Sequence, residues 1–253
     1  MIELLNKDCF EVMAGMKDHS IDCIITDPPY GSTELDFDRV KLDAEKMISE
    51  FQRLIKPNRA VVIFANLRFA TRIINANKKF FRYEWVWKKS MKVGFLDCNN
   101  RPLKQHEYIL IFGNGKPLYR PQMQPGKPYI KIRKMTEKAE HYGKHRRDTK
   151  VYDGGRFPTS VLSVPNPNFK SIHHTKKPTS LIEYLIKTYS NKNEMIFDPF
   201  MGSGTTGIAC LENDRDFLGC EIDADCFSKA QALINEEQIH LSELIPLQFE
   251  END

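Results

Sequence analysis

Short apolar runs alternate along the chain with segments in which apolar residues recur at helical spacing. Buried strands are predicted at 21–26 and 59–64, because both runs are apolar almost throughout, as in a parallel sheet covered on both faces. Apolar positions recurring every three to four residues over 43–55 predict a helix between them. The same patterns predict further strands at 3–6, 83–87, 107–112, 195–197 and 217–221, and further helices at 9–16, 69–77, 178–189, 204–212 and 225–235. This alternation predicts an α/β fold with a doubly wound, mostly parallel sheet.

Segment 115–170 interrupts the pattern. It is rich in Pro and Gly, shows no sustained period and interleaves aromatic residues with cations. A loop of this length without structure of its own is unusual inside a compact domain, so we interpret it as a functional insertion. The chain is therefore predicted to be a single domain, 1–253, with an insertion at 115–170.

The charge is unevenly distributed. Between Lys116 and Lys177 there are 15 Lys and Arg residues against four acidic ones, a net +11, which leaves −8 elsewhere because the whole chain carries +3. Such asymmetry predicts a face that meets a polyanion. A solvated surface loop is the alternative, but interleaved cations and aromatic rings favour a nucleic-acid face.

Composition narrows the class of protein. With 41% hydrophobic and 28% charged residues the chain has the make-up of a globular protein. No apolar run approaches the roughly 18–20 residues of a membrane span, and residues 1–5 lack the pattern of a signal peptide. The six cysteines form no Cys-x-x-Cys pair, which predicts free thiols, no metal site and a cytoplasmic location.

A glycine-rich loop lies between a predicted strand and a predicted helix. Gly202, Gly204 and Gly207 satisfy the G-x-G-x-x-G pattern, which permits a tight turn and close approach of a ligand. Glu221 lies 19 residues after Gly202, at the end of the next strand, where an acid accepts hydrogen bonds from ribose hydroxyls. The loop therefore predicts an adenosine-bearing cofactor. A turn that needs glycine only for packing is the alternative, and a Walker loop is excluded because no Gly-Lys-Ser/Thr follows.

The loop lies late in the sequence. Only 46 residues follow Gly207, so most of the sheet must come from upstream. A nicotinamide dehydrogenase usually places such a loop early, so the order here is that of a circularly permuted chain.

A second motif follows the buried strand 21–26. Its residues are Asp27, Pro28, Pro29 and Tyr30. The prolines fix φ and remove two backbone donors, which leaves carbonyl oxygens free to accept hydrogen bonds from a ligand. An acid, a rigid carbonyl and an aromatic ring at one strand end form a small site of acceptors and stacking surface. A plain strand-ending turn is the alternative.

These two motifs, in this order, resemble the beta class of DNA amino-methyltransferases, which use S-adenosylmethionine to methylate adenine N6 or cytosine N4. Asn6 to Cys9, Glu107 to Phe112 and His174 to Pro178 are similar to further elements of that family. The resemblance covers about 1–113 and 157–236. It implies a circularly permuted, Rossmann-like methyltransferase sheet, with 115–170 as the target-recognition region.

The resemblance also implies roles for the residues. The carboxylate of Asp27 and the carbonyl of Pro28, next to Pro29, would accept the two N–H groups of the target amine. Tyr30 would stack on the base, which must flip out of the duplex to be reached. For the cofactor, Asp8 would lie near the adenine, Glu221 on the ribose and Lys177 near the carboxylate. The expected cofactor-binding residues of the loop are Asp198, Phe200, Gly202, Ser203, Gly204, Thr205 and Thr206.

The basic segment is the expected DNA contact, with phosphate binding that weakens as salt rises and some side chains that read base edges. Besides Tyr30, the candidate DNA-binding residues are Lys131, Arg133, Lys134, Lys144, Arg146 and Arg147.

The sequence thus predicts a site-specific DNA adenine-N6 methyltransferase. Cytosine-N4 methylation is the nearest alternative, although such enzymes more often carry Ser in place of Asp27. An RNA methyltransferase is another, and an NAD-dependent oxidoreductase would leave the Asp27 motif unexplained. Duplex DNA is the expected partner. A homodimer, a companion restriction enzyme and a bacterial or phage source remain open.

Overall fold

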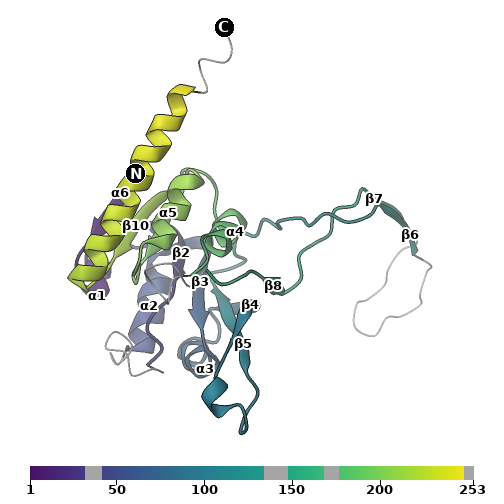
Figure 1. The fold of residues 1–253 in the computed structure, drawn as a ribbon, viewed down its shortest axis with the longest axis horizontal. Coiled ribbons are helices and arrows are strands. Elements are labelled where there is room, and N and C mark those ends of the chain that lie inside the picture. Colours follow the sequence, from purple (N-terminus) through teal and green to yellow (C-terminus); the bar gives the residue numbers. More distant parts are fainter. Residues whose placement is uncertain (32–41, 134–147, 168–176, 248–253) are drawn as a thin grey trace. The chain divides into compact units, whose positions relative to one another are not determined.

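A mixed sheet forms the centre of the structure, which is a computed structural model describing residues 1–31, 42–133, 148–167 and 177–247. Within these residues eight strands form one sheet in the order β1-β10-β9-β2-β3-β5-β4-β8 (Figure 1). Its strands are β1 (Ile2–Leu5), β2 (Ile21–Thr26), β3 (Ile55–Ala65), β4 (Phe81–Val93), β5 (Lys104–Phe112), β8 (Val161–Ser163), β9 (Met195–Asp198) and β10 (Asp216–Cys220). Only the pairs β3–β5 and β5–β4 are antiparallel in this sheet, which confirms the mostly parallel fold expected from the sequence.

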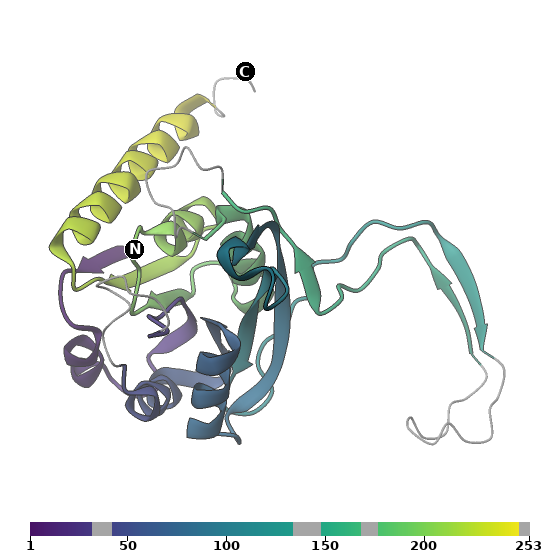
Figure 2. The same ribbon diagram turned by 60° about the horizontal axis from the view of Figure 1, so that its bottom comes forward.

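Helices cover both faces of the sheet, as the doubly wound pattern requires (Figures 1 and 2). The helices are α1 (Cys9–Gly15), α2 (Ala44–Leu54), α3 (Leu67–Ala76), α4 (Thr179–Tyr189), α5 (Thr205–Glu212) and α6 (Ala224–Leu247). One hydrophobic cluster joins α1, α2 and α3 to the sheet, and a second joins α4, α5 and α6 to it. Successive residues of β3 alternate between them: Val61 and Ile63 pack in the first cluster, Val62 and Phe64 in the second. The sheet is thus the middle of three layers.

Several elements extend beyond their expected bounds. Strand β3 begins directly after α2, at Ile55 rather than at Arg59, and α6 continues to Leu247 rather than ending near 235. Strand β4 extends beyond the expected 83–87 at both ends, β5 begins at Lys104 rather than at Glu107, and a 3-10 turn, η2 (Phe95–Asp97), lies between them.

The bounds of the insertion also differ from the expected 115–170. The chain divides into one compact unit of Met1–Arg120 with Ser160–Asp253 and a second unit of Pro121–Thr159. Strand β8 lies inside the expected insertion, yet it pairs in parallel with β4 in the main sheet, through Val86 and Val161. A strand of three residues gives too short a pattern to be recognised in the sequence.

The second unit has secondary structure that the sequence pattern did not predict. Strands β6 (Tyr129–Arg133) and β7 (Asp148–Tyr152) form an antiparallel pair, and a bridge joins Gln124 to Arg156. The Arg156 guanidinium lies 4.5 Å from the centre of the Tyr129 ring, a cation–π contact within this unit. Its role in target recognition stays a prediction.

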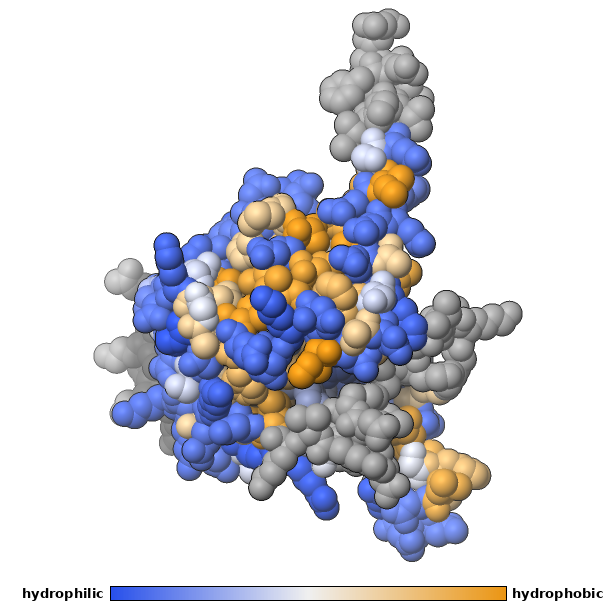
Figure 3. All heavy atoms as spheres, turned by 90° about the vertical axis from the view of Figure 1, so that its left-hand side faces the viewer, coloured by the Kyte–Doolittle hydropathy of each residue, from blue (hydrophilic) through white to orange (hydrophobic). Residues whose placement is uncertain are grey.

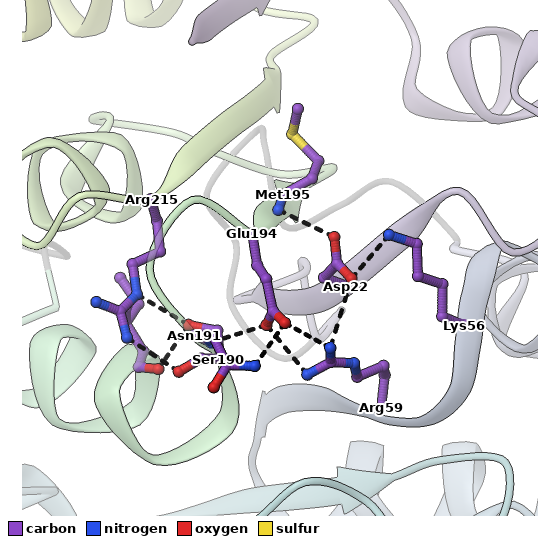
Figure 4. A network of polar contacts seen from close by, with 9 residues as sticks. Asp22, Lys56, Arg59, Ser190, Asn191, Glu194, Met195 and Arg215 are labelled. Carbon is purple, nitrogen blue, oxygen red and sulfur yellow. Dashed lines mark hydrogen bonds and ion pairs between the residues drawn. The ribbon is translucent and has the colours of Figure 1, made fainter.

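A polar network joins strands near their amino ends (Figure 4). The Asp27 motif and the glycine-rich loop follow the carboxyl ends of β2 and β9, so the network lies at the opposite end of these strands. Asp22 of β2 is almost fully buried, accepts a hydrogen bond from Lys56 at 2.8 Å and accepts another from the Met195 backbone at 3.2 Å. The Arg59 guanidinium pairs with Glu194 and lies 3.8 Å from Asp22. Burying a carboxylate is costly unless it is paired and hydrogen-bonded, so these contacts explain why an acid is tolerated within an apolar strand.

The surface of the larger unit carries exposed apolar side chains as well. Figure 3 looks at the side of the molecule where α1 and α6 lie and shows apolar residues gathered among hydrophilic ones.

In the described parts of the chain, no helix has the length and apolar character that a membrane crossing requires.

Candidate active site

Strands β2 and β9 are neighbours in the sheet, paired in parallel through Ile24 and Phe197. From β2 the chain passes through α2 to β3 on one side, whereas from β9 it passes through α5 to β10 on the other. The strand order therefore reverses between β2 and β9. In open α/β sheets the crevice at such a reversal, beyond the carboxyl ends of the strands, is where ligands bind. The Asp27 motif and the glycine-rich loop follow these two strands.

Asp198, the last residue of β9, holds the two motif segments together. Its carboxylate accepts hydrogen bonds from Thr26 at 2.8 Å, from Thr206 at 2.7 Å and from the Phe200 backbone at 3.2 Å. Burial raises the pKa of Asp198 to about 6, although the hydrogen bonds from Thr206 and Thr26 act in the opposite direction. Asp198 therefore organises the loop from within, and its predicted contact with a cofactor remains untested.

The loop needs glycine at some positions for its backbone conformation and at others for close packing. Gly204 precedes α5 with φ +76°, in the left-handed region that favours glycine. A Cβ at Gly207 would lie 2.7 Å from Ile234 and 2.9 Å from the Phe217 ring, so only glycine lets α5 approach α6 and β10 this closely. Gly202 differs, because a Cβ there would meet no atom of the described residues within 4 Å. The loop is thus packed on its inner side and open at Gly202.

Glu221 lies directly after β10 and reaches back to the loop. Its carboxylate accepts hydrogen bonds from the Gly202 backbone at 3.0 Å and from the Asp223 backbone at 2.9 Å. A carboxylate has about four acceptor positions, so two of these bonds leave capacity for ribose hydroxyls.

Asp8 lies at the same edge, because β1 pairs with β10 through Leu5 and Cys220. Its side chain caps α1 by accepting hydrogen bonds from the backbones of Phe10 at 2.8 Å and Glu11 at 3.3 Å. The described contacts of Asp8 are those of a helix cap, and its predicted contact with adenine stays a prediction.

In the glycine-rich loop, the hydroxyls of Ser203 and Thr205 lie 3.2 Å apart.

The carboxylate of Asp27 is held from two sides. The Tyr30 hydroxyl donates a hydrogen bond to Oδ1, and the ammonium of Lys177 forms an ion pair with Oδ2. The Tyr30 ring lies 5.3 Å from the ring of Phe69, centre to centre. Pro28 is buried, whereas Pro29 and Tyr30 are half-buried.

Lys177 also contacts a second acid. Its ammonium lies 3.5 Å from Glu107 of β5 and 5.0 Å from the centre of the Phe64 ring. Burial alone lowers the pKa of an ammonium group, but the carboxylates of Asp27 and Glu107 outweigh it and raise the pKa of Lys177. The positive charge of Lys177 is therefore stabilised by two carboxylates, that of Asp27 directly after β2 and that of Glu107 on β5.

A family model for N6/N4 methyltransferases, described as DNA methylase, matches residues 21–232. The chain belongs to this DNA methylase family. The match includes both motifs and the strands that carry them, and it confirms the resemblance inferred from the sequence.

Individual relatives agree with the family model. M.HpaI, a type II methyltransferase of Haemophilus parainfluenzae, is 24% identical over 246 residues, which cover 92% of the chain and 74% of that protein. M.BamHII, an orphan methyltransferase of Bacillus amyloliquefaciens, is 28% identical over 232 residues, covering 81% of the chain and 85% of that protein.

Solved structures share the fold. The crystal structure of the M1.HpyAVI–SAM complex matches with a TM-score of 0.60 at 24% identity, over 93% of the chain and 100% of that structure. PvuII DNA methyltransferase, which is cytosine-N4-specific, matches with a TM-score of 0.65 at 14% identity, over 91% of the chain and 85% of that structure.

The fold of this DNA methylase brings most of the predicted site residues to one edge of the sheet. Asp27 and Tyr30 follow β2, the loop 199–204 follows β9, Glu221 follows β10 and Asp8 follows β1. Lys177 joins them from the segment before α4, but its described contacts are with Asp27 and Glu107. Its expected place beside the cofactor carboxylate stays a prediction.

The predicted DNA contacts cannot be placed in the same way. Lys131 and Arg133 lie on β6, where their backbones pair with β7, and Tyr30 lies at the candidate site. Lys134, Lys144, Arg146 and Arg147 lie outside the described residues, as does His174.

Two charged residues at this site were not identified from the sequence. Glu107 lies beside Lys177, and the Lys89 ammonium lies 2.7 Å from the other oxygen of Glu107. One signal was present: Glu107 is an acid directly before the apolar run 108–112, where an unpaired acid would be costly. Its partners come from elsewhere in the chain, so the pattern alone does not name them.

Proposed function

We propose that this DNA methylase transfers the methyl group of S-adenosylmethionine to the N6 amine of adenine in duplex DNA. The observation that carries the proposal is the meeting of two motif segments at the crevice between β2 and β9, joined by the hydrogen bond from Thr26 to Asp198. A methyl donor and an amine must lie within about 3–3.5 Å of each other and in line before transfer. Segments that follow the carboxyl ends of adjacent parallel strands can hold two such reactants side by side.

The residues on the β9 and β10 side fit an adenosine-bearing cofactor. Glu221 retains acceptor capacity for ribose hydroxyls, and the loop is open at Gly202. When bound, the cofactor supplies an electrophilic methyl group on a positively charged sulfur. The loop residues 200–206 would surround its methionine part, and Asp8 would lie near its adenine.

The residues on the β2 side fit an exocyclic amine. The lone pair of such a nitrogen is delocalised into the ring, which makes it a poor nucleophile. Acceptance of both N–H groups, by the Asp27 carboxylate and the Pro28 carbonyl, favours a pyramidal nitrogen with a localised lone pair. Tyr30 offers a ring for stacking on the base, which must leave the duplex to reach the site.

The choice of adenine rests on Asp27. In the resembling class, cytosine-N4 enzymes more often carry Ser at this position, and this chain carries Asp. The fold itself does not favour either base, since it is shared with the cytosine-N4-specific PvuII enzyme.

Nucleoside mass spectrometry of treated DNA is the test. Purified protein is incubated with unmethylated plasmid DNA and S-adenosylmethionine, and the digested product is compared with a reaction lacking cofactor. N6-methyladenine is the expected product. N4-methylcytosine would overturn the base assignment alone, and absence of any methylated nucleoside would overturn the proposed activity.

A matched variant separates chemistry from cofactor binding. Asp27→Ala is expected to abolish transfer while calorimetry finds unchanged binding of S-adenosylhomocysteine. In a Glu221→Gln variant, by contrast, weakened cofactor binding is expected to be the main defect.

A further inference from the structure

A row of alternating charges leads away from Asp27 into the sheet. The Lys177 ammonium contacts the Asp27 carboxylate and lies 3.5 Å from Oε2 of Glu107, and the Lys89 ammonium lies 2.7 Å from Oε1 of Glu107. We call these four side chains (Asp27, Lys177, Glu107 and Lys89) the charge row. Its members come from the residue after β2, the segment before α4, β5 and β4, so the fold assembles it from distant parts of the chain.

The charge row is shielded from water away from Asp27. The side chains of Lys177, Glu107 and Lys89 are 12%, 14% and 17% exposed, whereas that of Asp27 is 32% exposed. The two ammonium groups lie over aromatic rings, Lys177 at 5.0 Å from Phe64 and Lys89 at 4.7 Å from Trp87. Charges in such surroundings interact strongly, and removing one partner leaves the other poorly compensated. The row ends at its most accessible member, the Asp27 carboxylate.

The contacts of Lys177 are unequal. It pairs directly with Asp27, whereas Oε2 of Glu107 is buried, has no hydrogen-bond partner among the residues that the structure describes, and is reached there only by the longer ion pair. Glu107 therefore attracts the Lys177 ammonium, while the direct ion pair of Lys177 with Asp27 is kept. With Oδ2 of Asp27 engaged by Lys177, the orientation of the carboxylate is fixed, and Oδ1 is the oxygen that the Tyr30 hydroxyl reaches.

We propose that Glu107 and Lys177 are positioning residues that orient and charge-balance Asp27 for the target amine, with Lys89 completing the charge of Glu107. The inference deepens the proposed function and rests on it. The row supplies two effects, one of geometry and one of charge.

The geometric effect follows from the salt bridge. A carboxylate held by Lys177 presents Oδ1 in one orientation, so the amine meets a fixed acceptor rather than a rotating one. A misplacement of about 1 Å at a reacting group can cost about 100-fold in rate.

The charge effect concerns the transfer itself. The amine would gain positive charge on accepting the methyl group that the bound cofactor supplies, and the Asp27 carboxylate would take the proton that the methylated amine releases. An uncompensated Lys177 beside Asp27 would oppose this charge. Glu107 offsets Lys177, so that Asp27 remains an effective acceptor for the amine.

The first test is Glu107→Gln, which keeps the size of the side chain and removes its charge. Lys177 should then bind Asp27 alone and compete with the amine. With plasmid DNA and labelled S-adenosylmethionine, kcat should fall about 10- to 100-fold, while the KM for DNA and the Kd for S-adenosylhomocysteine stay within about twofold. Glu84→Gln, at an exposed position on β4, is the matched control and should keep wild-type kinetics.

The second test is a double-mutant cycle with Lys177→Met. If Glu107 acts through Lys177, the two substitutions together should cost no more in kcat than Lys177→Met alone. The double variant removes two opposite charges together and so leaves neither of them buried without its partner. Its kcat can therefore still be compared with that of wild type if a single variant folds poorly. Lys192→Met, at an exposed surface ion pair with Asp214, controls for loss of a lysine.

The outcomes separate the possibilities. A lower melting temperature with unchanged kcat for Glu107→Gln would show a merely structural role and overturn the inference. Additive losses in the cycle would overturn it too, as would a Lys177→Met defect confined to cofactor Kd. A wild-type protein that transfers no methyl group would overturn the proposed function and the inference with it, whereas normal kcat in Glu107→Gln overturns the inference alone.

Discussion

The hydroxyl of Thr26 donates a hydrogen bond to Oδ1 of Asp198 at 2.8 Å, across 172 positions of sequence. It joins the end of β2, which delivers the Asp27 motif, to the end of β9, which delivers the glycine-rich loop. Both residues are buried, so the bond fixes the two motif segments relative to each other inside the protein.

Replacing Thr26 by Val should test this connection. The two side chains have similar shape, but Val lacks the donor and leaves a buried carboxylate oxygen with one partner fewer. The free energy of unfolding should fall by about 1–3 kcal/mol, measured by urea denaturation at pH 7. Thr71→Val, which removes an exposed hydroxyl on α3, is the control and should change it little. Equal denaturation midpoints for the two variants would contradict the prediction.

The buried carboxyl of Asp198 should make stability depend on pH. Its pKa is raised from 3.8 to about 6 in the folded protein, chiefly by burial. The folded state therefore binds a proton more tightly than the unfolded state. The protonated carboxyl therefore contributes to the free energy of unfolding, fully below about pH 4. This contribution, about 3 kcal/mol, is lost as the pH rises through 6.

The difference between wild type and Asp198→Asn isolates this effect. Because Asn does not titrate, the unfolding free energy of wild type relative to the variant should decrease between pH 4 and pH 7. Other titrating groups contribute to both proteins and cancel in the difference. Parallel stability curves for the two proteins would show that Asp198 keeps an ordinary pKa.

Packing around the loop predicts a steric defect for Gly207→Ala. The new Cβ would lie 2.7 Å from Ile234 and 2.9 Å from the Phe217 ring, so α5 or α6 must shift. Overpacking of this kind costs about 1–3 kcal/mol, and the shift should also weaken binding of S-adenosylhomocysteine, because α5 follows the loop directly. Gly15→Ala is the matched control, since within the described part of the chain a Cβ there meets nothing within 4 Å. Equal melting temperatures for the two variants would refute the packing argument.

The features that could be predicted from sequence were those with a local signal. The apolar run 21–26 and the spacing of Gly202, Gly204 and Gly207 depend on neighbouring residues, so they indicated a buried strand and a strand-to-helix loop directly. The order of the motifs supplied the family, and the family model that matches 21–232 agrees with it.

The features that could not be predicted depend on pairing between distant segments. The contact of Lys177 with Asp27 spans 150 positions, and Glu107 joins it only because β5 runs antiparallel beside β3 and β4. The ion pairs of Lys177 with Asp27 and Glu107 follow from the fold, and its contact with the cofactor carboxylate stays a prediction. Strand β8 was missed for a different reason, since three residues carry too little periodicity.

Tyr30 combines two functions that substitution can separate. Its hydroxyl binds Asp27, and its ring is the proposed stacking surface for the flipped base. Tyr30→Phe removes only the hydrogen bond, so it should retain the KM for DNA and lower kcat. Tyr30→Ala also removes the ring, and loss of stacking, worth about 1–3 kcal/mol per base, should raise the KM for DNA about 10-fold. Steady-state kinetics on one plasmid substrate measures both variants. If Phe and Ala raise the KM equally, the ring does not stack on the target base, and DNA recognition at this strand end must come from the Tyr30 hydroxyl instead.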